Sequence, residues 1–427
     1  MILTVKATSR LRGRVRLPAS KSYSIRAFLI AACGGNSLIV HPSDCDDAVV
    51  ARSAAGQLGA KIVRTGNNYK VSGKKKKVNV SRIKVKESGT VLRFIIPLVA
   101  LQRQHIKIDG EGTLRGRPNH ALAKTLRSMG LNVQGQGDKE SIPIYIRGGR
   151  LRGGRIEIDG SMSSQFISAL LITCPQLKED TQIILKGKKL VSLDYITMTR
   201  QVLKKSGIEI KSNGPRSFKI KACQRFKGFG KFIVPSDYGL AAFLLAAGVL
   251  TNSDVTLEGN LKDDFIQADK QILALLRKLN VKFTKTAKLI KIKGPFALKG
   301  GNFSLKDAPD LVPIMAVLAL FAKGKTRLYN IGHARVKESD RIGDLRQELL
   351  KVGAKIKEGQ GELVIYPRPS YRVNTFLDPH KDHRLAMAFS VLGLKLGARV
   401  KDIECVSKSY PQFVRDLKGL GAKVFRR

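Results

Sequence analysis

The stretch "SKSYSIRAFLIAA", residues 20–32, begins with small polar and basic residues and then becomes apolar. Its apolar residues recur at helical spacing, so the stretch predicts a helix whose body is buried. We expect Ser20 to cap this helix, and Lys21, Ser22 and Arg26 to lie on its first turns. Because the N-terminal end of a helix attracts anions, the stretch fits either an anion-binding site or an ordinary capped core helix.

The same pattern, a polar head followed by a strongly apolar helix, occurs six times along the chain. Successive copies begin at intervals of 68 to 75 residues. The predicted helices span residues 20–32, 88–101, 163–174, 236–250, 309–322 and 382–394. Recurrence at a nearly fixed interval predicts that one supersecondary unit is used six times. If the helices of neighbouring copies are parallel, their polar heads gather at one end and form a strong anion site.

A second feature recurs in step with these helices: an amphipathic helix that ends at Gly or Asn and is followed by a strand. Gly and Asn suit the left-handed backbone conformation that terminates many helices. The residues at this position are Gly59, Gly130, Gly207, Asn280, Gly353 and Gly421. Short alternating strands lie between successive markers, so each unit is predicted to be mixed α and β, with one buried helix and one exposed helix.

The six units divide into three and three near the glycine-rich segment 226–232. We expect a first domain over 17–228 and a second over 229–427, completed by residues 1–16. The N-terminal residues would supply the strand that is missing after the last copy. The chain would then cross between the domains twice, which suggests a hinge.

Composition limits the class of protein. The chain has 427 residues, of which 43% are hydrophobic, enough to pack two domains. Its five cysteines are scattered and form no C-x-x-C pair, which indicates reduced thiols rather than disulfides or zinc ligands. The sequence lacks an unbroken apolar run of about 18 residues and a recognisable signal peptide, so we expect a cytoplasmic protein that does not contact the membrane.

The formal net charge of +45 makes nucleic acid the first partner class to consider. Four lysines at 74–77 and the segment "RGGRLRGGR" at 147–155 support that idea. Aromatic residues make up only 6% of the chain, however, and neither basic segment is interleaved with stacking side chains. We therefore interpret 147–155 as a connection between two strands and the charge as a solvated surface, without a specific nucleic-acid partner.

Nine motifs, in this order, resemble the 5-enolpyruvylshikimate-3-phosphate synthase family over essentially the whole chain. They are "LPASKSYSIRA", "SGTVLRF", "GRPNHAL", "GSMSSQF", "LVSLDYI", "APDLVP", "ARVKESDRI", "DHRLAMAFSV" and "SKSYPQF". The resemblance implies an α/β fold of two domains, each an inverse α/β barrel-like arrangement of three βαβαββ-type units, with a hinge between them.

The resemblance also implies a transferase. It would move the enolpyruvyl group of phosphoenolpyruvate to the 5-hydroxyl of shikimate 3-phosphate and release phosphate, as the 3-phosphoshikimate 1-carboxyvinyltransferase of the shikimate pathway. That pathway leads to chorismate and the aromatic amino acids. No metal or organic cofactor is implied, and we expect a monomer whose partners are these two small molecules.

Site residues follow from the resemblance position by position. Those implied for shikimate 3-phosphate are Lys21, Ser22, Arg26, Ser163, Ser164, Gln165, Ser192, Tyr195, Asp310 and Lys337. Those implied for phosphoenolpyruvate are Lys21, Gly89, Arg117, Gln165, Arg341, His383, Arg384 and Lys408. Those implied for catalysis are Lys21, Asp310, Lys337 and Glu338. The reaction needs one group to take the hydroxyl proton and another to protonate C3 of the enol, and which group performs which transfer stays open.

Three positions depart from the family pattern: Glu87 and His333 stand where Asn is found, and Ala19 replaces a Gly. Glu87 matters most, because an acidic residue beside an anion site opposes substrate binding. A nearby Lys or Arg could neutralise it.

Alternative functions stay open. An enolpyruvyl transferase that acts on UDP-N-acetylglucosamine shares the architecture and phosphoenolpyruvate, but its loop cysteine and N-terminal lysine–asparagine pattern are not visible here. A basic nucleic-acid-binding protein would explain the charge but not the polar-headed helices. Asp378, His380, Asp382 and His383 could be read as metal ligands. The mixed charges of 335–341 could equally form an exposed ion-pair face of a helix.

Overall fold

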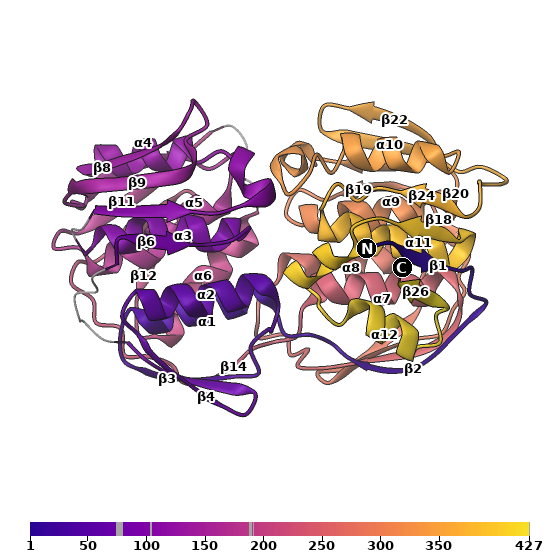
Figure 1. Cartoon of the computed structure of the whole chain (residues 1–427), viewed down its shortest axis with the longest axis horizontal. Coiled ribbons are helices and arrows are strands. Elements are labelled where there is room, and N and C mark those ends of the chain that lie inside the picture. Colours follow the sequence, from indigo (N-terminus) through magenta and orange to yellow (C-terminus); the bar gives the residue numbers. More distant parts are fainter. Residues whose placement is uncertain (74–79, 103–104, 188–189, 191, 427) are drawn as a thin grey trace. The chain divides into compact units, whose positions relative to one another are not determined.

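The computed structural model describes residues 1–426 except 74–79, 103–104, 188–189 and 191. The lysine run at 74–77 therefore lies outside the described residues. The chain forms two compact units (Figure 1), here named the N-terminal unit (Ala19–Val234) and the C-terminal unit (Met1–Pro18 with Pro235–Arg427). None of the described helices is long and apolar enough to cross a membrane.

In the described part of the N-terminal unit, three α-helices are buried and three are amphipathic. The α-helices are α1 (Lys21–Ala32), α2 (Asp46–Gln57), α3 (Gly89–Ala100), α4 (His120–Ser128), α5 (Ser164–Thr173) and α6 (Leu193–Lys205), with 3-10 turns η1 (Gly112–Gly116) and η2 (Cys174–Gln176). Its first sheet has the order β14 (Gly230–Ile233), β3 (Asn36–Val40), β5 (Asn68–Ser72), β4 (Lys61–Thr65). The second has the order β6 (Arg82–Lys84), β7 (His105–Asp109), β9 (Ser141–Gly149), β8 (Leu131–Gln136). The third has the order β10 (Gly154–Asp159), β11 (Thr181–Lys186), β13 (Ser217–Ile220), β12 (Ile210–Asn213).

The C-terminal unit repeats this arrangement. Its α-helices are α7 (Tyr238–Leu250), α8 (Gln271–Lys278), α9 (Val312–Leu320), α10 (Gly343–Lys351), α11 (His383–Leu396) and α12 (Phe413–Gly419). Its 3-10 turns are η3 (Ala268–Lys270), η4 (Pro309–Leu311), η5 (Gly332–Val336) and η6 (Ile403–Lys408). The first sheet has the order β16 (Phe283–Lys285), β17 (Leu289–Ile292), β15 (Asn252–Glu258), β2 (Arg10–Arg16). The second has the order β19 (Asn302–Ser304), β21 (Thr326–Tyr329), β23 (Glu362–Tyr366), β22 (Lys355–Gly359), and β18 (Leu298–Lys299) pairs with β20 (Ala322–Lys323).

The N-terminal strand β1 (Leu3–Val5) lies in the last sheet of the C-terminal unit. There it pairs antiparallel with β25 (Ala398–Val400) on one side and β26 (Val424–Arg426) on the other, and β24 (Thr375–Leu377) completes the sheet. The start and the end of the chain are therefore held in the same sheet.

Each four-stranded sheet that the structure describes has the same topology, with one parallel pair at an edge followed by two antiparallel pairs. In the second, third, fifth and sixth copies, a buried helix joins the two parallel strands, as in β6–α3–β7. In the first and fourth copies the strands are exchanged: β2, which leads into α1, pairs with β15, and β14, which leads into α7, pairs with β3.

This exchange moves the boundaries between the units from the predicted positions. Residues 229–234 were expected in the second domain, but β14 pairs with β3 in register Gly230↔Ser37 and so belongs to the N-terminal unit. Conversely, the Leu17 N–H donates to Glu258 O, and Pro18 O accepts from the Asp237 N–H, so 17–18 belong to the C-terminal unit. Backbone pairing across the predicted boundary is the physical reason for both corrections.

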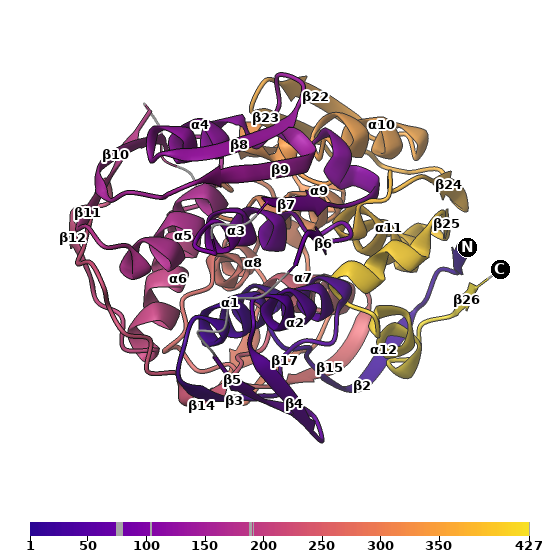
Figure 2. The ribbon, with the colours of Figure 1, turned by 60° about the vertical axis from the view of Figure 1, so that its left-hand side comes forward.

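The six predicted apolar helices are confirmed as α1, α3, α5, α7, α9 and α11. Every residue of α7 and α9 is buried, which explains why these helices are apolar on all sides. Helices α7, α9 and α11 contact one another, and α3 contacts both α1 and α5. In the N-terminal unit, Figure 2 shows β10, β11 and β12 at the left edge, outside α5.

The turn that follows each amphipathic helix is also as predicted. All six marker residues have φ between +68° and +96°, the left-handed region that favours Gly and Asn. The segment 147–155 connects β9, which ends at Gly149, to β10, which begins at Gly154. The five cysteines are free thiols.

Two glycines of the C-terminal unit allow a test of the left-handed conformation at the end of the amphipathic helices. Gly353 has φ +84° and Gly419 lies in α12, and an added Cβ would meet no atom within 4 Å at either position. We expect Gly353→Ala to lower the free energy of unfolding by about 1 kcal/mol, because only backbone strain is introduced. Gly419→Ala, the matched control, should be neutral or slightly stabilising. Thermal unfolding of both variants measures the difference, and equal midpoints would contradict the left-handed assignment.

Candidate active site

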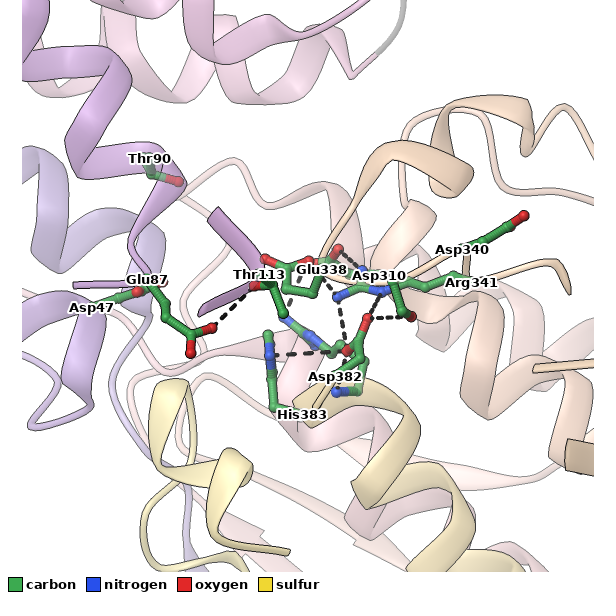
Figure 3. Close-up of polar contacts among 12 residues, drawn as sticks. Asp47, Glu87, Thr90, Thr113, Asp310, Glu338, Asp340, Arg341, Asp382 and His383 are labelled. Atoms are coloured by element: carbon green, nitrogen blue, oxygen red, sulfur yellow. Dashed lines mark hydrogen bonds and ion pairs between the residues drawn. The ribbon is translucent and has the colours of Figure 1, made fainter. Parts of the chain in front are cut away.

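Two predicted residues of the C-terminal unit, Asp310 and Glu338, contact Arg341, whose side chain is 1% exposed. Its Nη1 donates to Asp310 Oδ1 at 2.6 Å, and its Nη2 donates to Glu338 Oε2 at 2.9 Å. Its Nε donates to Asp382 Oδ2 at 2.7 Å. Figure 3 shows the three carboxylates gathered around this guanidinium. A buried arginine that binds three carboxylates is fixed in one orientation.

Asp382 links this cluster to the start of α11. Its Oδ1 accepts from the Arg384 N–H at 2.7 Å, so Asp382 is the N-cap of the helix. Its Oδ2 accepts from Ser339 Oγ at 3.1 Å as well as from Arg341. One fully buried carboxylate thus joins a helix N-terminus to the segment that carries Arg341.

Arg384 brings the heads of three buried helices together. Its Nη1 donates to Gly239 O in the first turn of α7 at 2.8 Å. Its Nη2 donates at 3.0 Å to Oδ2 of Asp310, which lies in η4 directly before α9. Arg384 itself is in the first turn of α11. The polar heads of the fourth, fifth and sixth copies therefore meet, as the repeat predicts.

Electrostatics set the protonation states in this cluster. Burial by itself would raise the pKa of the Asp310 carboxyl, but the charges of Arg384 and Arg341 lower it well below its usual range. Asp310 is therefore ionised at neutral pH and bound to two cations. Burial and the nearby charge of Lys337 lower the pKa of His333 to about 4, so its imidazole is neutral at pH 7.

The other predicted residues of this unit lie beside the cluster or in the same elements. His383 is the first residue of α11, with Nδ1 3.9 Å from Asp382 Oδ1. Lys408 is buried at the end of η6. Lys337 and Glu338 lie in the irregular segment between η5 and α10, so the interpretation of 335–341 as one face of a helix is wrong. The buried Arg341 also excludes an exposed ion-pair face.

In the N-terminal unit, Arg26 is buried between α1 and α6. Its Nε donates to Thr199 Oγ1 at 2.8 Å, its Nη1 to Ser22 O at 3.0 Å and its Nη2 to Tyr195 O at 3.3 Å. Its guanidinium also lies over the Phe94 ring, 5.2 Å from the centroid. Burial lowers the pKa of Arg26 to about 10, which leaves it positively charged at pH 7.

Sequence reasoning missed Arg93, which organises the heads of α3 and α5. Arg93 is 4% exposed, and its Nη1 donates to Gln165 Oε1 at 2.5 Å. Gln165 Nε2 in turn donates to Thr90 Oγ1 at 3.0 Å, and Ser163 Oγ accepts from the Gln165 N–H at 3.3 Å. The signal was present in the repeat, because Arg93 occupies the second turn of its helix, as Arg26 does in the first copy.

The start of α1 carries two residues that the sequence singled out, Ser20 and Lys21. Lys21 Nζ lies 3.0 Å from Asp47 Oδ2. Ser20 is at the N-cap position of α1, but its side chain makes no capping hydrogen bond; its carbonyl accepts from Ser24 instead, so the predicted side-chain cap is wrong.

Gly89, Ser164 and Ser192 lie at helix starts, whereas Arg117 follows the end of η1. A Cβ at Gly89 would lie 2.8 Å from Arg117 Nη1, so a larger residue at this position would displace that guanidinium. Ser192 precedes α6 in the left-handed conformation, with φ +54°. Ser164 is the buried first residue of α5.

Glu87, the departure that opposes an anion site, is held by the η1 turn. Its Oε2 accepts from Thr113 Oγ1 at 3.0 Å (Figure 3). A Cβ at Gly112, which has φ +57°, would lie 2.0 Å from Glu87 Oε1. The turn is therefore shaped around the Glu87 carboxylate.

The residues once considered as metal ligands have other partners. Asp378 Oδ2 binds Lys401 Nζ at 2.9 Å, and Asp382 binds Arg341. Across the part of the chain that the structure describes, no group of three or more His, Cys, Asp or Glu side chains is arranged to hold a metal ion.

Comparison with known proteins identifies the family of this chain. The family described as EPSP synthase (3-phosphoshikimate 1-carboxyvinyltransferase) matches residues 5–417 of the chain. The chain belongs to this family. Among curated proteins, the 3-phosphoshikimate 1-carboxyvinyltransferase of Methanocella arvoryzae is 38% identical over 96% of this chain and 97% of that protein. The protein of the same name from Methanococcus vannielii is 34% identical over 99% of both chains. The predicted family is confirmed.

Solved structures confirm the predicted fold class. The EPSP synthase of Acinetobacter baumannii superposes with a TM-score of 0.81 over all of both chains, at 24% identity. The enolpyruvyl transferase NikO of Streptomyces tendae gives a TM-score of 0.79 over 99% of this chain and 98% of its own, at 18% identity. Both belong to enolpyruvyl transferases with this two-domain α/β fold.

The carboxylate cluster predicts a large stability effect at Arg341. We expect Arg341→Leu to lower the free energy of unfolding by about 3–5 kcal/mol, because it leaves Asp382 buried without its cation. The control is Arg327→Leu, which removes a half-exposed pair with Glu362 and should cost about 1 kcal/mol or less. Denaturant unfolding of both variants measures the two costs. Similar costs would show that the Arg341 network contributes no more than a surface ion pair.

Proposed function

We propose that this chain transfers the enolpyruvyl group of phosphoenolpyruvate to the 5-hydroxyl of shikimate 3-phosphate and releases phosphate. The observation that carries the proposal is the Asp310 carboxylate shared by Arg341 and Arg384 at the heads of three buried helices. Two guanidiniums and a carboxylate in one cluster suit the addition of an alcohol to an anionic enol phosphate. The names of the curated relatives support this activity, which would place the chain in the shikimate pathway.

Phosphoenolpyruvate carries a phosphate and a carboxylate, the groups that guanidinium forks bind best. Arg384 Nε is buried and has no hydrogen-bond partner among the described residues, so a bound anion can satisfy it. An anion at Arg341 instead has to compete with three carboxylates. The residues we assign to phosphoenolpyruvate are Lys21, Gly89, Arg117, Gln165, Arg341, His383, Arg384 and Lys408.

Shikimate 3-phosphate carries a phosphate and several hydroxyls, and the starts of α1, α5 and α6 supply matching groups. Arg93 and Thr90 fix the Gln165 amide, and Arg26 holds the start of α1 to Tyr195. The residues we assign to this substrate are Lys21, Ser22, Arg26, Ser163, Ser164, Gln165, Ser192, Tyr195, Asp310 and Lys337.

The reaction balances with the side chains present. In the addition step the 5-hydroxyl oxygen bonds to C2 of phosphoenolpyruvate, Asp310 takes the hydroxyl proton, and Glu338 or Lys337 gives a proton to C3. In the elimination step the group that protonated C3 takes a proton back from C3, the C2–O bond to phosphate breaks, and the departing phosphate takes the proton held by Asp310. Lys21, Arg117 or Lys408 stabilises the charge of the departing phosphate.

The charges around Asp310 explain how binding of an anionic substrate can make this carboxylate a stronger base. Two guanidiniums hold its pKa low, which makes the free carboxylate a weak base. An anionic substrate that binds Arg341 and Arg384 reduces their attraction for Asp310, so the basicity of Asp310 rises when substrate is present.

Closure at a hinge, a monomeric state, a cytoplasmic location and independence from cofactors and specific nucleic acids stay predictions.

Phosphate release with each substrate omitted in turn tests the reaction. We expect release only when phosphoenolpyruvate and shikimate 3-phosphate are both present, because the alcohol must add before phosphate can leave. EDTA should leave the rate unchanged, since the family resemblance implies no metal. The fold alone does not choose the acceptor, so UDP-N-acetylglucosamine is the control acceptor. Release with that sugar nucleotide instead would overturn the proposed substrate.

Amide substitutions test the acid–base roles. Asp310→Asn and Glu338→Gln should each lower kcat by about 10²- to 10⁴-fold, because they keep the shape of the side chain and remove proton transfer. Glu362→Gln removes a carboxylate that binds Arg327 on the surface, and it should leave kcat unchanged.

A binding residue should give a different kinetic pattern. Arg26→Ala should raise KM for shikimate 3-phosphate more than it lowers kcat. Steady-state kinetics of these four variants, each checked for folding by circular dichroism, make the comparison. Small and equal effects at Asp310, Glu338 and Arg26 would mean that the clusters are structural.

A further inference from the structure

Asp269 is a buried carboxylate near this cluster that the mechanism above does not use. Asp269 lies in η3, directly before α8, and is 6% exposed. Its Oδ1 is buried and has no hydrogen-bond partner among the described residues. Buried polar atoms are nearly always paired, so an unpaired carboxylate oxygen beside a substrate-binding cluster points to a functional requirement.

Gly239 defines what Asp269 faces. A Cβ added to Gly239 would lie 2.3 Å from Asp269 Oδ2 and 2.9 Å from Arg384 Nη1. The carboxylate and the guanidinium therefore both pack against the same bare Cα in the first turn of α7. Arg384 Nη1 also donates to Gly239 O at 2.8 Å. Any side chain at this position would push the two charged groups apart.

Four charged groups on other elements act on Asp269. Asp310 in η4 and Asp237 at the N-cap of α7 are negative, whereas Arg384 in α11 and Lys337 after η5 are positive. Burial, together with the charge of Asp310, raises the pKa of Asp269 to about 7, and Arg384 opposes this shift. The ionised form of Asp269 thus depends on the cation that it faces.

We propose that Asp269 is a positioning residue that holds Arg384 across Gly239 and takes up one proton from solvent when an anionic group binds Arg384. This inference rests on the proposed role of Arg384 as a ligand of phosphoenolpyruvate. A bound anion neutralises the cation that favours the Asp269 carboxylate, so the protonated carboxyl becomes the stable form. Protonation of Asp269 removes one negative charge from the site when the anion binds. Arg384 then faces the bound anion and Asp310, but no longer an ionised Asp269 carboxylate.

Linkage gives the sign of the effect. If binding adds a proton to Asp269, affinity for phosphoenolpyruvate is greatest where the free site is already protonated and falls as pH rises above about 7. Above that pH the loss approaches about tenfold per pH unit for a single linked proton. The substrate phosphate titrates near pH 6, but this contribution is the same for every variant.

The test measures KM for phosphoenolpyruvate from pH 6 to 8.5, at saturating shikimate 3-phosphate, in the wild type and in Asp269→Asn. We expect KM of the wild type to rise about tenfold between pH 7.5 and 8.5 relative to the variant. The control is Asp263→Asn: this exposed carboxyl binds Lys270 and Lys285, whose hydrogen bonds lower its pKa to about 2, so it stays ionised throughout. Asp269→Ser is the second neutral variant, in case the amide fails to fold.

Titration calorimetry separates this inference from the proposed function. Phosphoenolpyruvate is added without shikimate 3-phosphate, in two buffers of different ionisation enthalpy, and the difference gives the number of protons taken up. At pH 7.5 a carboxyl with a pKa of about 7 is already about one-quarter protonated, so we expect the wild type to take up about three-quarters of a proton more than Asp269→Asn.

Each outcome decides between the two ideas. Equal proton uptake and equal pH profiles in the wild type and the neutral variants would overturn the role of Asp269, even with full turnover. Proton uptake that depends on Asp269 in a protein without turnover would retain this inference and overturn the proposed reaction. Absence of phosphoenolpyruvate binding would overturn both.

Discussion

A helix that is buried on every side can present polar groups only at its ends, and this constraint organises the chemistry of the molecule. All residues of α7 and α9 are buried, so the polar residues of the candidate site that accompany these helices lie at the first turn or just before it. Asp310 in η4 and Arg384 in α11 illustrate the rule. The free N–H groups and the positive dipole at the same ends favour anionic ligands, so the packing that stabilises the fold also supplies the site.

Buried cations need buried carboxylates, and this pairing determines how the site meets its substrate. Arg341 is saturated by Asp310, Glu338 and Asp382, and removal of Arg341 would leave the buried Asp382 carboxylate without its cation. The cluster is therefore stable without ligand but rich in negative charge. In the proposed function, an anionic substrate redistributes these interactions by weakening the hold on Asp310 and by favouring protonation of Asp269. The same contacts that fix the arginines thus set the electrostatic cost of binding.

The repeat made much of this architecture predictable, because a buried helix and a left-handed turn both depend on residues that are close together in the sequence. The six apolar helices and the six residues at positive φ follow from periodicity and from Gly or Asn at the turn. The exchange of β2 and β14 does not, since each strand precedes a buried helix of the repeat and only tertiary pairing decides which sheet it joins. For the same reason, a domain boundary placed at the glycine-rich segment assigned β14 to the second domain, whereas β14 belongs to the N-terminal unit.

Prediction of the site was limited by what a single sequence reveals about orientation. The family resemblance supplied Arg341 and Arg384, but not Arg93, whose role depends on reaching Gln165 on another helix. The unpaired oxygen of Asp269 has no sequence signal either, although Gly239 within an otherwise apolar helix could have marked a close approach.

The net charge of +45 contrasts with the carboxylates that crowd Arg341 and Arg384. Surface cations act on diffusing anions over about 10 Å at moderate salt, so they can raise the rate of encounter with phosphorylated substrates. The alternating exposed arginines of β2 belong to this outer charge. Buried pairs are screened much less, so the carboxylates around the two arginines, rather than the surface charge, determine how tightly an anion is held after it arrives.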